Sequence, residues 1–201
     1  MNFRKNYPFY LLILFFIFAI IMGIEPKYRY LWFVENIILL IFIPLMIISY
    51  RYFKFSNASY TLIFLFVILQ TIGAHFSYAE VPFSFITNLL GFERNNYDRF
   101  VHFMFGFLLG FPLREFFIRT SKIENKFYSY FVPIMIGFAF GAIYEILEWI
   151  AIITILKPTT TNASLFLGAQ GDVWDAQKDM ALVGSGFMLS MLITFFKNLR
   201  K

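Results

Sequence analysis

The chain alternates between long apolar runs and short polar segments, and this pattern predicts its architecture. A helix needs about 20 predominantly apolar residues to cross a bilayer, and only structures that pair all their backbone polar groups internally can span one. The runs long enough to do so lie at residues 8–24, 30–50, 58–77, 98–118, 127–155 and 180–196. The pattern predicts an all-α, polytopic integral membrane protein, a six-helix bundle forming a single domain over residues 1–201.

The first apolar run follows two basic residues, Arg4 and Lys5, and so also resembles the start of a secretory signal peptide. The apolar region of a signal peptide is typically about 7–15 residues long. The run here is longer, and the Gly23–Pro26 segment that follows is a poor cleavage site. We therefore expect the first helix to be retained.

Composition agrees with a membrane protein and excludes several classes of function. Hydrophobic residues make up 60% of the chain and charged residues 14%, with a mean hydropathy of +0.69, whereas about 25% of a soluble domain is charged. The absence of cysteine excludes disulfides and thiolate metal sites. The net charge of +5 comes from short segments between spans, where basic residues usually fix topology. We expect the lipid bilayer, and not nucleic acid, to be the partner.

The distribution of Lys and Arg predicts the orientation of the bundle. With the N-terminus inside, 11 basic residues fall on the inner side and 6 on the other. The inner set is Arg4, Lys5, Arg51, Lys54, Arg114, Arg119, Lys122, Lys126, Lys197, Arg200 and Lys201, and the outer set is Lys27, Arg29, Arg94, Arg99, Lys157 and Lys178. Cytoplasmic loops carry the excess of basic residues, which predicts that both termini are cytoplasmic.

In this orientation, most of the acidic residues fall on the outer side of the bundle. Only Glu115 and Glu124 fall at the cytoplasmic end. The residues expected in the outer loops or outer leaflet are Glu25, Glu35, Glu80, Glu93, Asp98, Glu145, Glu148, Asp172, Asp175, Asp179, His75 and His102. Ionisable groups within a membrane are costly and usually face a partner or a wet cavity. The sequence therefore predicts a polar cluster at one depth, built by several helices.

Two pairs within the spans are candidates for chemistry. Asp98 and His102 are four residues apart, on one face of a helix, and form a plausible pair of metal ligands, although Asp98 also suits a helix N-terminus. Glu145 and Glu148 are three apart, and two such close carboxylates need a cation or a proton between them. They are either metal ligands or a general acid and base, or they form a structural ion network with Arg94, Arg99 or Lys178. Both interpretations stay open.

The segment before the last span carries the densest charge. Asp172, Asp175 and Asp179 lie at spacings of three and four, so they either complete the cluster or form a solvated start to the last helix. His75 and Glu80, at the end of the third span, are secondary candidates with Asp172. Oxygen and imidazole ligands without thiolate suit Mg²⁺, Mn²⁺ or Zn²⁺. We expect Asp98, His102, Glu145 and Asp179 as metal ligands, with Glu145, Glu148 and Asp175 as catalytic residues.

Four segments, His75–Glu80, Tyr97–Phe103, Tyr144–Trp149 and Gln170–Met180, together resemble the YjdF-type bacterial inner-membrane proteins over nearly the whole chain. That resemblance implies a multi-pass protein of the bacterial cytoplasmic membrane, in a family whose activity is uncharacterised. A more distant resemblance is to VanZ-like membrane proteins, whose polar positions match Asp98, His102, Glu145 or Glu148, Asp175 and Asp179. The chain departs from the VanZ-like pattern in having Arg99 in place of a lysine and no asparagine in Ala181–Gly184.

Three functions are compatible with this pattern. The first is a membrane enzyme whose outer-leaflet cluster holds a divalent metal and acts on a lipid or lipid-linked envelope substrate. The second is a non-catalytic scaffold or binding protein whose cluster is structural. The third is a small ion-coupled transporter, disfavoured because the polar groups lie at one end instead of the midplane and no internal repeat is evident.

Overall fold

The computed structural model describes residues 3–89, 91, 93–121, 125–156, 166 and 169–200. Its long helices match the six predicted membrane spans. Six helices are long and apolar enough to cross a membrane. They are α1 (Phe3–Gly23), α2 (Arg29–Ser49), α3 (Asn57–Phe76), α5 (Tyr97–Ser121), α6 (Lys126–Ala151) with its π-helical continuation η1 (Ile152–Leu156), and α8 (Asp175–Leu199). A short helix, α4 (Ser84–Leu89), precedes α5. The predicted all-α, six-helix membrane architecture is confirmed.

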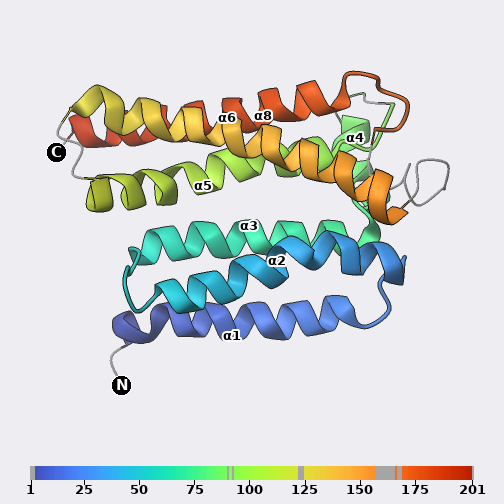
Figure 1. Cartoon of the computed structure of the whole chain (residues 1–201), viewed down its shortest axis with the longest axis horizontal. Helices are drawn as coiled ribbons and strands as arrows, with labels where there is room; N and C mark the ends of the chain where they lie inside the picture. The colour runs from blue at the N-terminus through green and yellow to red at the C-terminus, as the bar shows by residue number, and fades with distance from the viewer. Residues whose placement is uncertain are drawn as a thin grey trace.

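Some predicted features lie outside the described residues. They include most of the polar segment at 157–171, between the fifth and sixth predicted spans, and three charged residues used to predict the orientation, Lys122, Glu124 and Lys201. The described helices place the start of α1 and the end of α8 at the same end of the bundle (Figure 1), as an even number of crossings requires. The side of the membrane that this end faces stays a prediction.

The bundle consists of two groups of three helices (Figure 1). In the first group, α1 and α2 pack on α3 around buried Phe15, Leu39 and Val67. In the second group, α6 and α5 both pack on α8, and α3 joins the two groups by packing on α5. Helix α5 is therefore central, since it contacts both groups.

Glycines allow α5 and α8 to approach until their backbones touch. A Cβ on Gly106 would lie 2.1 Å from the carbonyl oxygen of Val183, and one on Gly186 would lie 2.2 Å from that of Phe103. Small residues permit this close packing of membrane helices. Both helices start at the same end of the bundle, which we call the site end (Figure 1). The first turns of α5 and α8, with their acidic residues, therefore lie side by side.

Glu115, a carboxylate at the opposite end of the bundle, accepts several hydrogen bonds. Glu115 accepts hydrogen bonds from the backbone N–H of Ser56 at 2.8 Å, from the hydroxyls of Ser56 and Ser59, and from Arg119 at 2.7 Å. Ser56 in turn caps the N-terminus of α3. Glu115 thus ties α5 to α3, and its role is structural.

Candidate metal centre

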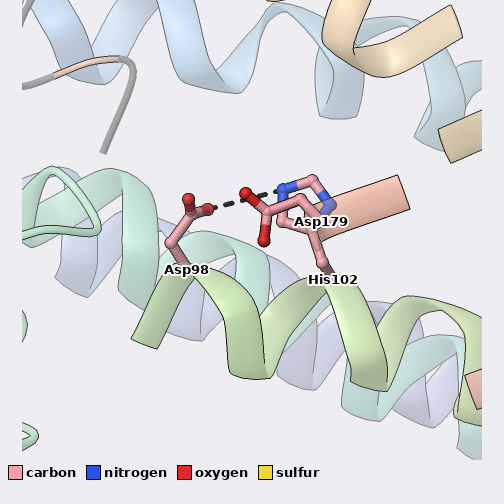
Figure 2. Close-up of side chains that lie close together, drawn as sticks. All are labelled: Asp98, His102 and Asp179. Carbon is pink, nitrogen blue, oxygen red and sulfur yellow. Dashed lines mark ion pairs between the residues drawn. The ribbon is translucent and has the colours of Figure 1, made fainter. Parts of the chain in front are cut away.

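Three of the predicted ligands meet at the site end. Asp98 and His102 lie one turn apart on α5, and Asp179 reaches them from α8, with its carboxylate beside the imidazole (Figure 2). One ligand atom from each residue lies within 4.8 Å of the other two. All three residues are buried, with exposed fractions of 7% for Asp98, 8% for His102 and 2% for Asp179. The separation is little more than twice a metal–ligand distance of about 2.0–2.2 Å, so one ion could contact all three.

Glu145 of α6 borders this trio. Its Oε1 lies 3.8 Å from Nε2 of His102, and the same Nε2 lies 3.5 Å from Oδ1 of Asp98. Tyr144, its neighbour on α6, packs against the His102 ring with the two ring centroids 5.5 Å apart. Three helices therefore contribute to the site. Glu148, one turn further along α6, is near enough to interact electrostatically with Asp98, Glu145 and Asp179.

Among the described residues, the acids of the site outnumber the basic side chains that contact them. Asp98, Glu145 and Asp179 face one imidazole, and no lysine or arginine among the described residues forms an ion pair with any of them. Oδ1 of Asp179 and Oε1 of Glu145 are buried and have no hydrogen-bond partner in that part of the chain. Buried like charges repel and must be neutralised by a proton or a cation. The arrangement suits a bound cation.

The basic residues of the site end pair with other acids instead. Asp175 is 2.8 Å from Nη1 of Arg94 and 3.0 Å from Nη2 of Arg99. Asp172 contacts Arg99 and Lys178 directly. This group, which we call the ion network, links the segment before α5 to the start of α8. In the part of the chain that the structure describes, neither Glu145 nor Glu148 has an ion pair with Arg94, Arg99 or Lys178.

Asp172 lies just before α8, and its contacts stabilise the ionised form of its carboxyl group. The Lys178 ammonium, the backbone N–H of Trp174 and the Arg99 guanidinium hold the pKa of Asp172 well below the usual value. Further hydrogen bonds reinforce the junction, because the side-chain amide of Gln170 accepts from the backbone N–H of Asn95 at 3.1 Å and donates to its carbonyl oxygen at 2.8 Å. The loops in front of α5 and α8 are thus fastened together beside the trio.

The secondary candidates His75 and Glu80 lie with the N-terminal helices. Nδ1 of His75 is 2.8 Å from the carbonyl oxygen of Met22, and this contact joins the ends of α3 and α1. Glu80 forms an ion pair with Lys27 at 2.8 Å, which lowers the pKa of its carboxyl. Among the described residues, neither belongs to the group of potential metal ligands that meets at the site end.

Three buried polar residues near the site were not named as metal ligands or catalytic residues from the sequence, although Glu35 was expected in the polar cluster. Glu35 on α2 is 5% exposed, and neither of its carboxylate oxygens has a hydrogen-bond partner in the described chain. The same holds for Nε2 of Gln70 and the hydroxyl of Tyr78. Glu35 could have been identified from the sequence, because it is an acid within an apolar run. Tyr78 was harder to identify from the sequence. Gly73 was an indirect sign of it, because the Tyr78 ring occupies the space where a Cβ of Gly73 would lie, 2.5 Å away.

Comparison with known proteins identifies the family. The model of a family described as predicted membrane proteins, DUF2238, matches residues 7–200. The chain is also 33% identical over 166 residues to the inner membrane protein YjdF of Escherichia coli strain K12, covering 81% of this chain and 78% of that protein. No solved structure matches. Neither match bears on the resemblance to VanZ-like proteins, which stays a prediction.

The chain therefore belongs to the DUF2238 family of membrane proteins, and the YjdF-type resemblance is confirmed. Together with its six membrane-length helices, this makes it a multi-pass protein of the bacterial inner membrane.

Proposed function

We propose that Asp98, His102 and Asp179 bind one divalent cation, and that the protein is a metal-dependent enzyme acting at the outer leaflet on a lipid or lipid-linked envelope substrate. The observation that carries this proposal is the convergence of three buried ligand atoms within 4.8 Å from two helices. The unpartnered Oδ1 of Asp179 supports it, since it is a buried ligand atom with no hydrogen-bond partner in the described chain. Oxygen and imidazole donors favour Zn²⁺, Mg²⁺ or Mn²⁺.

The neighbouring residues would supply the remaining functions. A cation held by three protein ligands keeps open positions, at which it can polarise a phosphoryl or acyl oxygen or activate water. Glu145, next to His102, is placed to act as a fourth ligand or as the general acid and base, with Glu148 one turn behind it. Asp175 is held by two arginines, which favours a positioning role over direct catalysis.

A non-catalytic scaffold or binding protein is the second candidate, and the ion network favours it. Arg94, Arg99 and Lys178 pair with acids at the start of α8, as a purely structural cluster would require. For that candidate, substitutions in the trio change stability alone. For an enzyme, they remove product formation while the fold persists.

The Glu145→Gln variant tests the catalytic proposal. Wild type and variant would be reconstituted in proteoliposomes made from a bacterial inner-membrane lipid extract, supplied with Zn²⁺, Mg²⁺ or Mn²⁺, and the lipids analysed by mass spectrometry. We expect new lipid products with wild type, none with Glu145→Gln, and unchanged products with Glu93→Gln, an exposed control acid. Equal products from wild type and Glu145→Gln would exclude a catalytic role for Glu145, and no product from wild type would favour the scaffold.

A further inference from the structure

An apolar groove runs between the two helix groups and ends at the candidate metal centre. Its volume is about 530 Å³, within the range of about 300–1,000 Å³ typical of small-molecule sites. Its floor comes from α3 and α5, and its walls from α2 and α6. Apart from its polar end, the lining consists of aliphatic and aromatic side chains such as Leu45, Phe105 and Phe140.

The groove opens sideways, towards the surrounding hydrocarbon. Wall residues are half exposed, with exposed fractions of 58% for Ile41 on α2 and 50% for Ile143 on α6. At the site end, the hydroxyl of Tyr30 on α2 donates to the carbonyl oxygen of Ile155 at 3.1 Å, and Leu31 packs against η1. This contact joins α2 to η1 beyond the groove. A molecule in the groove would therefore enter from the bilayer.

The end of the groove nearest the site is polar and has unused donors. His102 and Tyr144 line it, so the groove and the trio share a wall. Gln70 and Tyr78 line it too, and both are more than nine-tenths buried. The Gln70 amide nitrogen and the Tyr78 hydroxyl have no hydrogen-bond partner in the described chain. Burial raises the pKa of Tyr78 well above its usual value, so the phenol keeps its proton and remains a donor. Unpaired buried donors are costly, which indicates that a ligand supplies acceptor oxygens.

The length of the groove fits one lipid chain. From His102 to Phe116 it follows fourteen residues of α5, or about 21 Å at 1.5 Å per residue. One leaflet contributes about 15 Å of hydrocarbon, half of a core of about 30 Å. An acyl chain that starts at the site end therefore fits within the groove along its whole length.

We propose that the groove binds one acyl chain of a diacyl glycerophospholipid from the surrounding bilayer. The ester carbonyl oxygens accept hydrogen bonds from Gln70 and Tyr78, and a cation held by Asp98, His102 and Asp179 would face the headgroup phosphate. The inference deepens the proposed function by naming the substrate class, and it rests on that function only for the claim that this lipid is the substrate. Binding in the groove does not require the metal.

A photoreactive phospholipid with a diazirine in its acyl chain tests the groove. The full-length protein would be reconstituted in nanodiscs with this lipid, irradiated, and the cross-linked residues mapped by mass spectrometry. The blocking variant is Ile143→Trp, and the matched control is Ile146→Trp, an isoleucine of α6 that is equally exposed, at 53%, but does not line the groove. We expect cross-links on groove residues in wild type and Ile146→Trp, and about a tenfold loss in Ile143→Trp, the effect of about 1.4 kcal/mol. Groove cross-links unaffected by Ile143→Trp, or cross-links spread evenly over all helices, would overturn the proposal.

An ether-linked analogue tests the polar anchors, because it lacks the ester carbonyls. Used as a competitor against the photoreactive lipid, the ester lipid should compete about five- to tenfold better than the ether lipid in wild type, as expected for one or two hydrogen bonds. In Gln70→Leu this preference should shrink. Equal competition by both lipids in wild type would refute the ester contact, and better competition by an isoprenoid phosphate would reassign the groove to a prenyl lipid.

The metal site and the lipid site can be tested separately. Ile143→Trp should bind as much metal as wild type, and Asp179→Asn should keep its groove cross-links. Loss of cross-linking in Asp179→Asn would contradict metal-independent lipid binding. Absence of metal from wild type, with cross-links intact, would refute the metal site and leave the lipid site standing.

Discussion

Gly106 of α5 lies against the backbone of Val183 of α8, so closely that a Cβ would sit 2.1 Å from its carbonyl oxygen. One turn before Gly106 on α5 stands His102, and one turn before Val183 on α8 stands Asp179. The contact therefore fixes the spacing of two of the three proposed ligands. A contact between two helix backbones, without any polar side chain, thus determines the geometry of the polar site.

The Gly106→Ala variant should destabilise the bundle and open the site. The new methyl collides with backbone, which cannot move aside as a side chain can, and such overpacking typically costs about 1–3 kcal/mol. The matched control is Gly141→Ala, whose Cβ would have the Val183 side chain as its nearest neighbour, at 3.3 Å. In mixed micelles, the free energy of unfolding should fall clearly in Gly106→Ala and change much less in Gly141→Ala. Equal effects would show that the α5–α8 contact is not specially tight.

Glu35 and Glu115 should respond in opposite ways to the same substitution. Glu115 accepts four hydrogen bonds, so Glu115→Gln should lower the free energy of unfolding by about 1–3 kcal/mol. Glu35 is buried and has no hydrogen-bond partner for either oxygen in the described chain, so Glu35→Gln removes a costly carboxylate. Its free energy of unfolding should stay the same or rise. A loss in Glu35→Gln comparable to that in Glu115→Gln would show that Glu35 is satisfied and structural.

The ion network should make the protein sensitive to acid. The pKa of Asp172 is lowered in the folded state by Lys178, the Trp174 N–H and Arg99. A lowered folded-state pKa contributes stability that is fully present above the unfolded value, about 3.9 for aspartate, and is lost as the pH falls below it. Thermal unfolding followed from pH 7 to pH 3 should show the melting temperature falling in the acid range.

The acid sensitivity should weaken when the network loses this carboxylate. Asp172→Asn should lower the melting temperature at pH 7 and flatten its fall towards pH 3. Glu93→Gln, which removes an exposed acid that has no ion pair with a described residue, should leave both unchanged. If Asp172→Asn and wild type had parallel pH profiles, the network would not be the source of the sensitivity.

The sequence predicted the helices well because membrane spans follow from apolar length alone. Where α8 begins is less evident, since its first two turns carry Asp175 and Asp179 and resemble a loop. The helix starts at Asp175, before the predicted span at residue 180. Asp175 is tolerated there because it pairs with arginine in the ion network, and Asp179 because it belongs to the trio.

The site was only partly predictable because spacing along one helix is visible in the sequence and contact between helices is not. Asp98 and His102 could be paired from their spacing. Their meeting with Asp179 depends on Gly106 and Gly186, which indicate close packing but not which helices pack. Gln70 and Tyr78 could not be assigned, because their importance comes from lacking partners in the folded chain.

The metal content of the purified protein tests the central claim most directly. Wild type, Asp179→Asn and Glu145→Gln would be purified in detergent and measured by mass spectrometry of metals, with Asp172→Asn as the control acid of the ion network. We expect one divalent ion per chain in wild type and in Asp172→Asn, loss of the ion in Asp179→Asn, and a reduced content in Glu145→Gln. A metal-free wild type that binds no added Zn²⁺, Mg²⁺ or Mn²⁺, or equal metal in wild type and Asp179→Asn, would contradict it.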